Sequence, residues 1–139
     1  MILIVFGISW FQLKDGERKT RDAQRKADVE LVARKLVAYF GDHNIYPAAS
    51  ESGTIAACGL WANERCLWGQ GAIKDAEGVT YLSKLPQDPL DRLYVYVPNA
   101  ERNKFRIYVG LERSQDRDLK HDLTIACGMN VQCNWYVEN

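Results

Sequence analysis

The chain has 139 residues, with 18 basic and 18 acidic side chains, so its formal net charge at neutral pH is zero. This length fits one domain, and an apolar fraction of 47% excludes a chain that is disordered over most of its length. The zero net charge excludes nucleic-acid-binding proteins whose whole surface is basic.

The chain begins with an uncharged, strongly apolar segment, Met1–Leu13. The segment is shorter than the roughly 20 residues with which a helix spans a bilayer, and it lacks the basic start and cleavage site of a secretory signal peptide. A buried core helix is the conservative interpretation. However, the segment is apolar on every side, which favours packing against lipid or against a bundle of like helices.

The following segment, residues 14–40, predicts that the helix continues. It contains no proline, only one glycine, and many good helix formers. Gly41 stands where a helix C-cap glycine is expected, and Pro47 prevents continuation soon afterwards. We therefore expect one helix to about Phe40, roughly 60 Å long at 1.5 Å per residue. One face carries apolar residues three or four positions apart: Val29, Val32, Leu36 and Phe40, widened by Ala33 and Val37.

Such a helix is too long for the rest of the chain to cover, because a domain of about 100 residues has a radius of gyration near 13 Å. Its apolar first half must project and contact lipid or other copies of the chain. The segment Lys14–Lys35 has eight basic and five acidic residues, a net +3, so the remainder is −3. A solvated helix face is the conservative interpretation of that charge; the alternative is stacking of basic helix on acidic head between copies.

The four cysteines form two local pairs, Cys58 with Cys66 and Cys127 with Cys133. An even number in local pairs predicts two disulfides and an oxidising compartment, with two local bridges as the simplest of the three possible connectivities. Free thiols and a zinc site with a histidine are the alternatives; the cysteine spacings exceed those of paired zinc ligands. Residues 42–75 are otherwise expected to be irregular. Two tryptophans at the first cysteine loop are either core anchors or an exposed contact patch: Trp61 and Trp68.

The rest of the chain predicts a short helix and then a small sheet. The helix is expected around Glu77–Ser83, before a proline-rich turn. Leu93–Val97 and Phe105–Leu111 predict an antiparallel hairpin, and Trp135–Val137 predicts a third strand. The predicted fold is α+β: a long N-terminal helix packed on a small antiparallel sheet. The expected organisation is a helix over residues 1–41, with an apolar assembly half (1–13) and an amphipathic half (14–41), and a globular head over 42–139.

No catalytic motif is found, so we do not expect an enzyme. His43 is expected to hydrogen-bond the last carbonyls of the helix rather than to act as a ligand or a base. His121 lies in a charged segment. No cofactor or metal is predicted, with calcium as the weaker alternative to a solvated loop after the hairpin. The carboxylates in that segment are Glu112, Asp116, Asp118 and Asp122.

Several segments together resemble the type IV pilin family, which includes the secretion pseudopilins. Arg21–Val32 resembles the polar half of the pilin helix, and Tyr46-Pro47 resembles the family's Gly-x-Tyr-Pro. Tyr81–Pro89 is similar to its Tyr-Leu-x-x-Leu-Pro-x-Asp-Pro segment, the most specific match. The predicted hairpin and the ending Cys133–Val137 complete the pattern. The resemblance implies the pilin fold.

The resemblance also implies a structural subunit of a pilus-like extracellular filament. Its partners would be copies of itself and, before assembly, the bacterial inner membrane and the pilus assembly machinery. The alternative is a minor pilin or a secretion pseudopilin that binds DNA or a surface ligand, although nucleic acid is not a favoured partner. A membrane-anchored hydrolase would need a nucleophile and a base, for which we find no candidate pair. The residues expected in the filament core are Ile2, Ile4, Phe6, Gly7, Ile8, Trp10 and Leu13.

The start of the chain departs from the family pattern. The family's glycine cut site, apolar first residue and glutamate at the fifth mature position are not found, and Val5 lies where that glutamate would fall if Met1 were the mature start. We therefore expect either that part of the usual apolar helix is absent from the chain or that the pilin is atypical. Peptidase processing and glutamate-mediated docking are not carried over.

Overall fold

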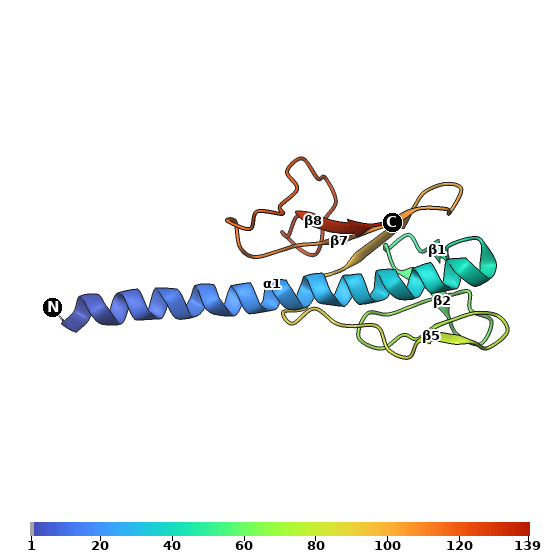
Figure 1. Ribbon diagram of the computed structural model, residues 1–139, viewed down its shortest axis with the longest axis horizontal. Helices are drawn as coiled ribbons and strands as arrows, with labels where there is room; N and C mark the ends of the chain where they lie inside the picture. Colours follow the sequence, from blue (N-terminus) through green and yellow to red (C-terminus); the bar gives the residue numbers. More distant parts are fainter. Residues whose placement is uncertain (1) are drawn as a thin grey trace.

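A computed structural model describes the backbone of residues 2–139 and the side chains from residue 7 onward. Met1 and the side chains of Ile2, Ile4 and Phe6, all within the predicted assembly segment, lie outside the described residues. One long helix, α1 (Ile2–His43), and small antiparallel sheets make the chain α+β, as predicted (Figure 1).

The helix α1 is continuous over 42 residues, which corresponds to a length of about 63 Å. The continuous helix is confirmed, but its predicted end at Gly41 is wrong. The helix runs on to His43, and Asn44 then takes the left-handed conformation with φ 55°. The N–H of Asn44 donates to the carbonyl of Phe40 at 2.7 Å, so asparagine provides the terminus expected of glycine.

The first half of α1 extends beyond the head (Figure 1). Residues 7–20 are exposed, except for the half-buried Asp15, and from residue 7 onward the first buried residue of the helix is Asp22. The part of the chain that the structure describes contains no helix both long enough and apolar enough to cross a membrane.

The second half of α1 packs against a three-stranded sheet, as predicted. The sheet comprises β6 (Val95–Pro98), β7 (Phe105–Val109) and β8 (Trp135–Glu138), with β7 in the middle and antiparallel to both neighbours. Ile107 faces Tyr96 on one side and Val137 on the other. The helix stripe and the sheet share one hydrophobic core that includes Val29, Val32, Leu36, Ile107 and Val109, all fully buried. The stripe is confirmed except at Val37, which is 48% exposed on the side of α1 that the head does not cover, so its predicted place in the stripe is wrong.

The segment before this sheet is more regular than expected. It contains a second antiparallel sheet of β1 (Ala48–Ala49), β2 (Ile55–Cys58) and β3 (Glu64–Arg65), with β2 in the middle. Pairing between two-residue strands leaves almost no periodic pattern in the sequence. The expectation of an irregular segment over residues 42–75 is therefore wrong in part.

The short helix predicted around Glu77–Ser83 is wrong, because this segment belongs to an antiparallel hairpin. Its strands are β4 (Ile73–Lys74) and β5 (Thr80–Leu82). Gly78 takes φ +89°, and the carboxylate of Asp75 accepts the backbone N–H of Val79 at 2.7 Å. The turn chemistry of aspartate and glycine thus outweighs the helix propensity of the residues around it.

Both predicted disulfides are present, Cys58–Cys66 and Cys127–Cys133, so the alternatives of free thiols and of a zinc site built from cysteines are wrong. The two tryptophans at the first cysteine loop differ in environment. Trp68 packs against the core, with its ring edge-on to Tyr94 at 5.1 Å, whereas Trp61 is 70% exposed. One is a core anchor and the other is a surface group.

The disulfides predict a definite result in mass spectrometry. In the denatured but unreduced protein we expect no alkylated cysteine, and after reduction we expect all four to be alkylated. Replacing both Cys127 and Cys133 with serine should lower the free energy of unfolding by about 2–3 kcal/mol, because the loop is no longer closed in the unfolded chain. Alkylation of all four thiols before reduction would contradict the assignment.

Candidate functional site

Among the side chains described on the projecting half of α1, from residue 7 onward, four large apolar ones are exposed to solvent. Successive residues of an α-helix are rotated by about 100°, so relative to Ile8 the others point at about 200°, 300° and 140°. The apolar surface therefore surrounds the helix, and a single partner on one side cannot cover it. The four are Ile8, Trp10, Phe11 and Leu13, with exposures of 56, 66, 77 and 65%.

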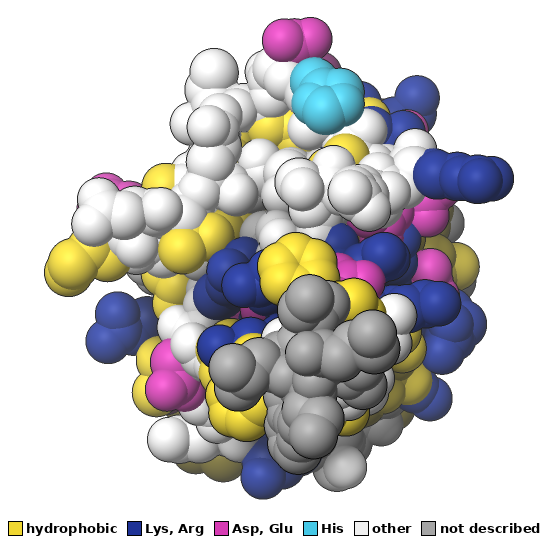
Figure 2. Space-filling view, turned by 90° about the vertical axis from the view of Figure 1, so that its left-hand side faces the viewer, with side chains coloured by type: hydrophobic (Ala, Val, Ile, Leu, Met, Phe, Trp, Pro, Cys, Tyr) yellow, Lys and Arg dark blue, Asp and Glu magenta, His cyan; other side chains and the backbone are white. Residues whose placement is uncertain are grey.

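Two glycines on the projecting helix lie in open space. A Cβ atom added to Gly7 or Gly16 would meet no atom of the chain within 4 Å, so no contact within the subunit requires a glycine there. Small residues on an exposed helix allow a neighbouring helix to approach closely. Figure 2, which looks at this end of the molecule, shows hydrophobic side chains around the helix among lysine and arginine side chains.

The structure tests the position of the predicted assembly residues but not their role. Gly7, Ile8, Trp10 and Leu13 lie on the projecting half, as their place in the sequence requires. Phe11 belongs with them and was missing from the predicted set, although it is the most exposed of the four large side chains. The sequence could have indicated Phe11 as well, because the segment Met1–Leu13 is apolar on every side of the helix.

Arg25 is a fully buried charge at the point where the head begins to cover α1. Its Nε donates to Asp88 Oδ2 at 2.5 Å, and its Nη1 donates to Asp22 Oδ1 at 2.9 Å and to Glu112 Oε1 at 2.7 Å. Asp88 lies between β5 and β6, and Glu112 follows β7. One guanidinium group therefore fastens two separate loops of the head to the helix.

Neighbouring contacts reinforce this attachment. Arg21 binds both carboxylate oxygens of Glu112, at 2.7 and 2.6 Å. The carboxylate of Asp22 accepts the backbone N–H groups of Glu112 and Arg113, each at 2.9 Å. Lys26 Nζ contacts a carboxylate further along the same loop, that of Asp116, at 2.9 Å. We call this set the Arg25 network; its members are Arg21, Asp22, Arg25, Lys26, Asp88, Glu112 and Asp116.

The Arg25 network changes two expectations from the sequence. The basic segment of α1 is not simply a solvated face, because three of its cations pair with carboxylates of the head. Those carboxylates include Glu112, Asp116 and Asp118 of the calcium alternative, while Asp122 is exposed. Because basic side chains already neutralise three of the four groups, the structure gives calcium no support there.

The signal for the network was present in the helix periodicity. Counting back from Val29 by four and then by three residues reaches Arg25 and Asp22, so both continue the apolar stripe of α1. A charged residue on a core-facing stripe needs a buried partner. Which carboxylates supply it depends on the tertiary fold, since Asp88 and Glu112 are distant in the sequence.

Acid is expected to weaken this attachment. Hydrogen bonds from Arg21 lower the pKa of Glu112 from 4.5 to about 2, despite the opposing effect of burial. For Asp88, burial raises the pKa, but hydrogen bonds from Arg25 and from two backbone N–H groups outweigh it and lower the pKa. The carboxyl groups of Glu112 and Asp88 therefore have lower pKa values in the folded protein than in the unfolded chain. Their ion pairs stabilise the fold fully above about pH 4.5, and this stabilisation is lost as the pH falls towards about 2.

Urea unfolding at a series of pH values would measure this effect. We expect the protonation of Glu112 alone to lower the free energy of unfolding by an amount on the order of 3 kcal/mol between about pH 4.5 and about pH 2. The Glu112→Gln variant should be less stable at neutral pH and should show a flatter profile. Equal pH profiles for the variant and the parent protein would contradict the assignment.

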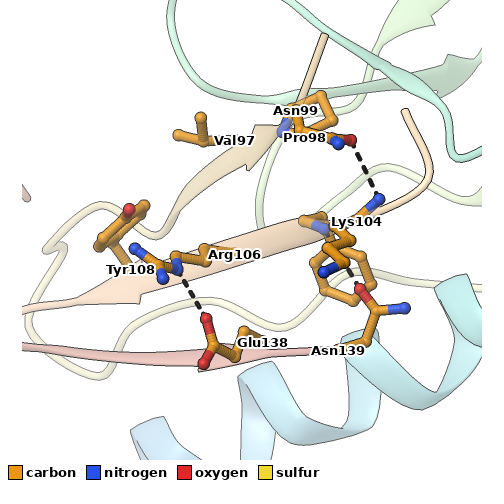
Figure 3. Close-up of a pocket in the computed structure, with 9 residues that line it drawn as sticks. Val97, Pro98, Asn99, Lys104, Arg106, Tyr108, Glu138 and Asn139 are labelled. Atoms are coloured by element: carbon orange, nitrogen blue, oxygen red, sulfur yellow. Dashed lines mark hydrogen bonds and ion pairs between the residues drawn. The ribbon is translucent and has the colours of Figure 1, made fainter. Parts of the chain in front are cut away.

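A shallow hollow of about 530 Å³ lies on the sheet that β6, β7 and β8 form (Figure 3). Arg106 and Glu138 form an ion pair across it, with 2.7 Å between Nε and Oε2. The described residues that line the hollow include no serine, cysteine or histidine.

The two histidines lie apart. His121 is exposed in the loop after β7. The expectation that His43 binds the last helix carbonyls is wrong: its Nε2 lies 3.3 Å from Asp75 Oδ2, in the turn between β4 and β5. This contact joins the C-terminal end of α1 to the head.

Comparisons of the chain with protein-family models, with curated proteins and with solved structures found no match. Any inference about function therefore rests on the chain's own residues. They combine an exposed apolar helix half, a head held to that helix by a buried ionic network, and two disulfides.

Proposed function

We propose that the chain is a type IV pilin-like structural subunit, with the pilin fold, which polymerises into an extracellular filament through the projecting half of α1. The observation that carries the proposal is the ring of exposed apolar side chains at residues 8–13, on the half of α1 that extends from the head. Before assembly, the same apolar surface would lie in the inner membrane, where the pilus assembly machinery takes it up.

The free energy for assembly comes from burying that ring. Each large apolar side chain contributes roughly 1.5–3 kcal/mol when it is fully buried, so four contribute on the order of 6–12 kcal/mol per subunit. A two-fold dimer covers one side of a helix, whereas a helical array surrounds each helix with neighbours. Head-to-tail contacts that do not close into a ring produce such an open filament.

The segments that resemble pilins also meet in the structure. Arg25 lies in the pilin-like helix segment, and its buried partner Asp88 lies in the Tyr-Leu-x-x-Leu-Pro-x-Asp-Pro-like segment. Tyr46 of the Tyr-Pro step is buried and stacks on Phe40 of α1, with ring centroids 4.6 Å apart. A head held to its helix in this way can occupy a fixed position on a filament, and the disulfides suit an oxidising compartment.

Electron microscopy of the full chain tests the proposal. The protein is purified in detergent and imaged before and after the detergent is removed. We expect dispersed subunits in detergent and helical filaments after its removal. A monomer that stays dispersed without detergent would overturn the proposal.

A second candidate function is the binding of a surface ligand, and one observation supports it. Leu60 and Trp61 are 80% and 70% exposed, and both lie in the loop closed by the Cys58–Cys66 disulfide. A minor subunit that presents this loop to a surface ligand would enter filaments but would not form them alone. The loss of ligand binding in Trp61→Ala, with unchanged polymerisation, would distinguish this function from the first.

A further inference from the structure

A cluster of side chains of the types that ligate metal ions lies at the C-terminal end of α1, opposite the end that projects. His43 is the last residue of the helix, Asp75 follows β4, Glu77 lies in the turn to β5, and Tyr81 lies within β5. The end of α1 lies beside this hairpin in Figure 1. The proposed assembly uses none of these residues.

The donor atoms of this cluster have the spacing of ligands around a small metal ion. His43 Nε2 lies 3.3 Å from Asp75 Oδ2, and Tyr81 Oη lies 3.2 Å from Asp75 Oδ2 and 3.3 Å from His43 Nε2. The three atoms form a nearly equilateral triangle. A tetrahedron with edges of about 3.3 Å has its centre about 2.0 Å from each corner, which is the usual zinc–nitrogen and zinc–oxygen distance.

A fourth ligand is within reach. One potential ligand atom from each of His43, Asp75 and Glu77 lies within 4.8 Å of the others. Glu77 is exposed, so its side chain is free to turn towards the triangle without disturbing the core. The set then contains one imidazole nitrogen and carboxylate oxygens, with the tyrosine hydroxyl beside them.

The triangle and its neighbour Asp42 offer more acceptor atoms than there are protons to share. Tyr81 has one hydroxyl proton, and its shortest contact is with Asp42 Oδ2 at 2.6 Å. With that proton directed to Asp42, the oxygens of Tyr81 and Asp75 face each other at 3.2 Å without a proton between them. Only one further proton, on His43 Nε2, is available to serve both oxygens. A cation at the centre would interact favourably with all three atoms.

The surroundings hold two of the ligands in place. Asp75 is 4% exposed, and its other oxygen accepts the N–H of Val79 at 2.7 Å, so Oδ2 is left to face His43. The ring of Tyr39 packs against the imidazole of His43, with centroids 4.4 Å apart. Such partners around the ligands fix their orientation, which strengthens metal binding.

We propose that His43, Asp75 and Glu77 bind a divalent transition-metal ion of the zinc class, with the Tyr81 hydroxyl or a water as the fourth ligand. The imidazole nitrogen selects this class, because calcium and magnesium prefer oxygen ligands only. The ion joins the end of α1 to the β4–β5 hairpin and stabilises the head. This site is independent of the proposed polymerisation.

Zinc titration of the full chain in detergent, followed by calorimetry, tests the proposal. We expect one Zn²⁺ per chain and a melting temperature that rises with Zn²⁺ but not with Ca²⁺. Co²⁺ at the same site should show the visible absorption of a four-coordinate ion. His43→Gln and Glu77→Gln should each weaken binding by more than about tenfold, since loss of even an outer partner of a metal ligand weakens binding by about 10–100-fold.

The chain provides a matched control. His121→Gln removes the other histidine, which is exposed and distant from the cluster, and it should bind Zn²⁺ as the parent protein does. Glu77 is exposed, so its variant is expected to fold even if changes at the buried Asp75 are not tolerated. The proposal is overturned if Zn²⁺ does not bind, if Ca²⁺ alone stabilises the protein, if His43→Gln binds Zn²⁺ as tightly as the parent protein, or if binding is lost in His121→Gln.

Discussion

The Phe11→Glu variant is expected to lose polymerisation while its head remains folded. Phe11 is 77% exposed in the subunit, so its replacement should change the free energy of unfolding by no more than about 0.5 kcal/mol. In an assembled bundle, the same position would place a carboxylate among apolar side chains, which costs several kcal/mol without a partner. Since each 1.4 kcal/mol changes an equilibrium tenfold, the critical concentration should rise by at least about 100-fold.

Sedimentation of the polymer over a range of protein concentrations measures this effect. Met129→Glu is the matched control, because Met129 is 92% exposed but lies on the head, beside the Cys127–Cys133 disulfide. We expect the control to polymerise as the parent protein does. If Phe11→Glu polymerises at the same critical concentration as the control, then the projecting half of α1 does not form the assembly contact.

The Arg25→Met variant is expected to destabilise the head more than any single surface change. Removing the guanidinium leaves Asp88 and Glu112 buried near Asp22 without their shared cation. Breaking a buried ion pair from one side costs about 3–5 kcal/mol, because the remaining charge stays desolvated. For a domain of this size, we expect the melting temperature to fall by roughly 10–20 °C.

Thermal unfolding followed by circular dichroism provides the measurement, with Arg18→Met as the control on the exposed part of the same helix. A double-mutant cycle separates the ion pair from simple loss of packing. Arg25→Met combined with Asp88→Asn should lose less stability than the sum of the two single variants, because each single change leaves the other charge unpaired. Additive losses, or an Arg25→Met variant as stable as Arg18→Met, would refute the role given to Arg25.

Much of this fold was predictable because its signals are local. The 3.6-residue stripe through Val29 and Leu36 predicts the packed half of α1, and the alternation in Phe105–Val109 predicts the central strand β7. Closely spaced cysteines predict their own pairing. In each case a few neighbouring residues contain the whole signal.

The errors arose where a distant or single-residue contact decides the structure. The turn at Gly78 makes a hairpin of a segment with helical composition, and Asn44 rather than Gly41 ends α1. His43 looked like a capping residue because its partner Asp75 is brought near only by that hairpin. The burial of Arg25 depends on Asp88 and Glu112, which only the tertiary fold brings to the helix.

In the proposed filament, the apolar half of α1 forms the inside and the disulfide-closed head forms the outside. Image reconstruction of the filaments by electron cryomicroscopy would locate both parts. We expect Ile8, Trp10, Phe11 and Leu13 to lie at the filament axis, each in contact with helices of neighbouring subunits. A reconstruction with the heads at the axis and these side chains facing solvent would contradict it.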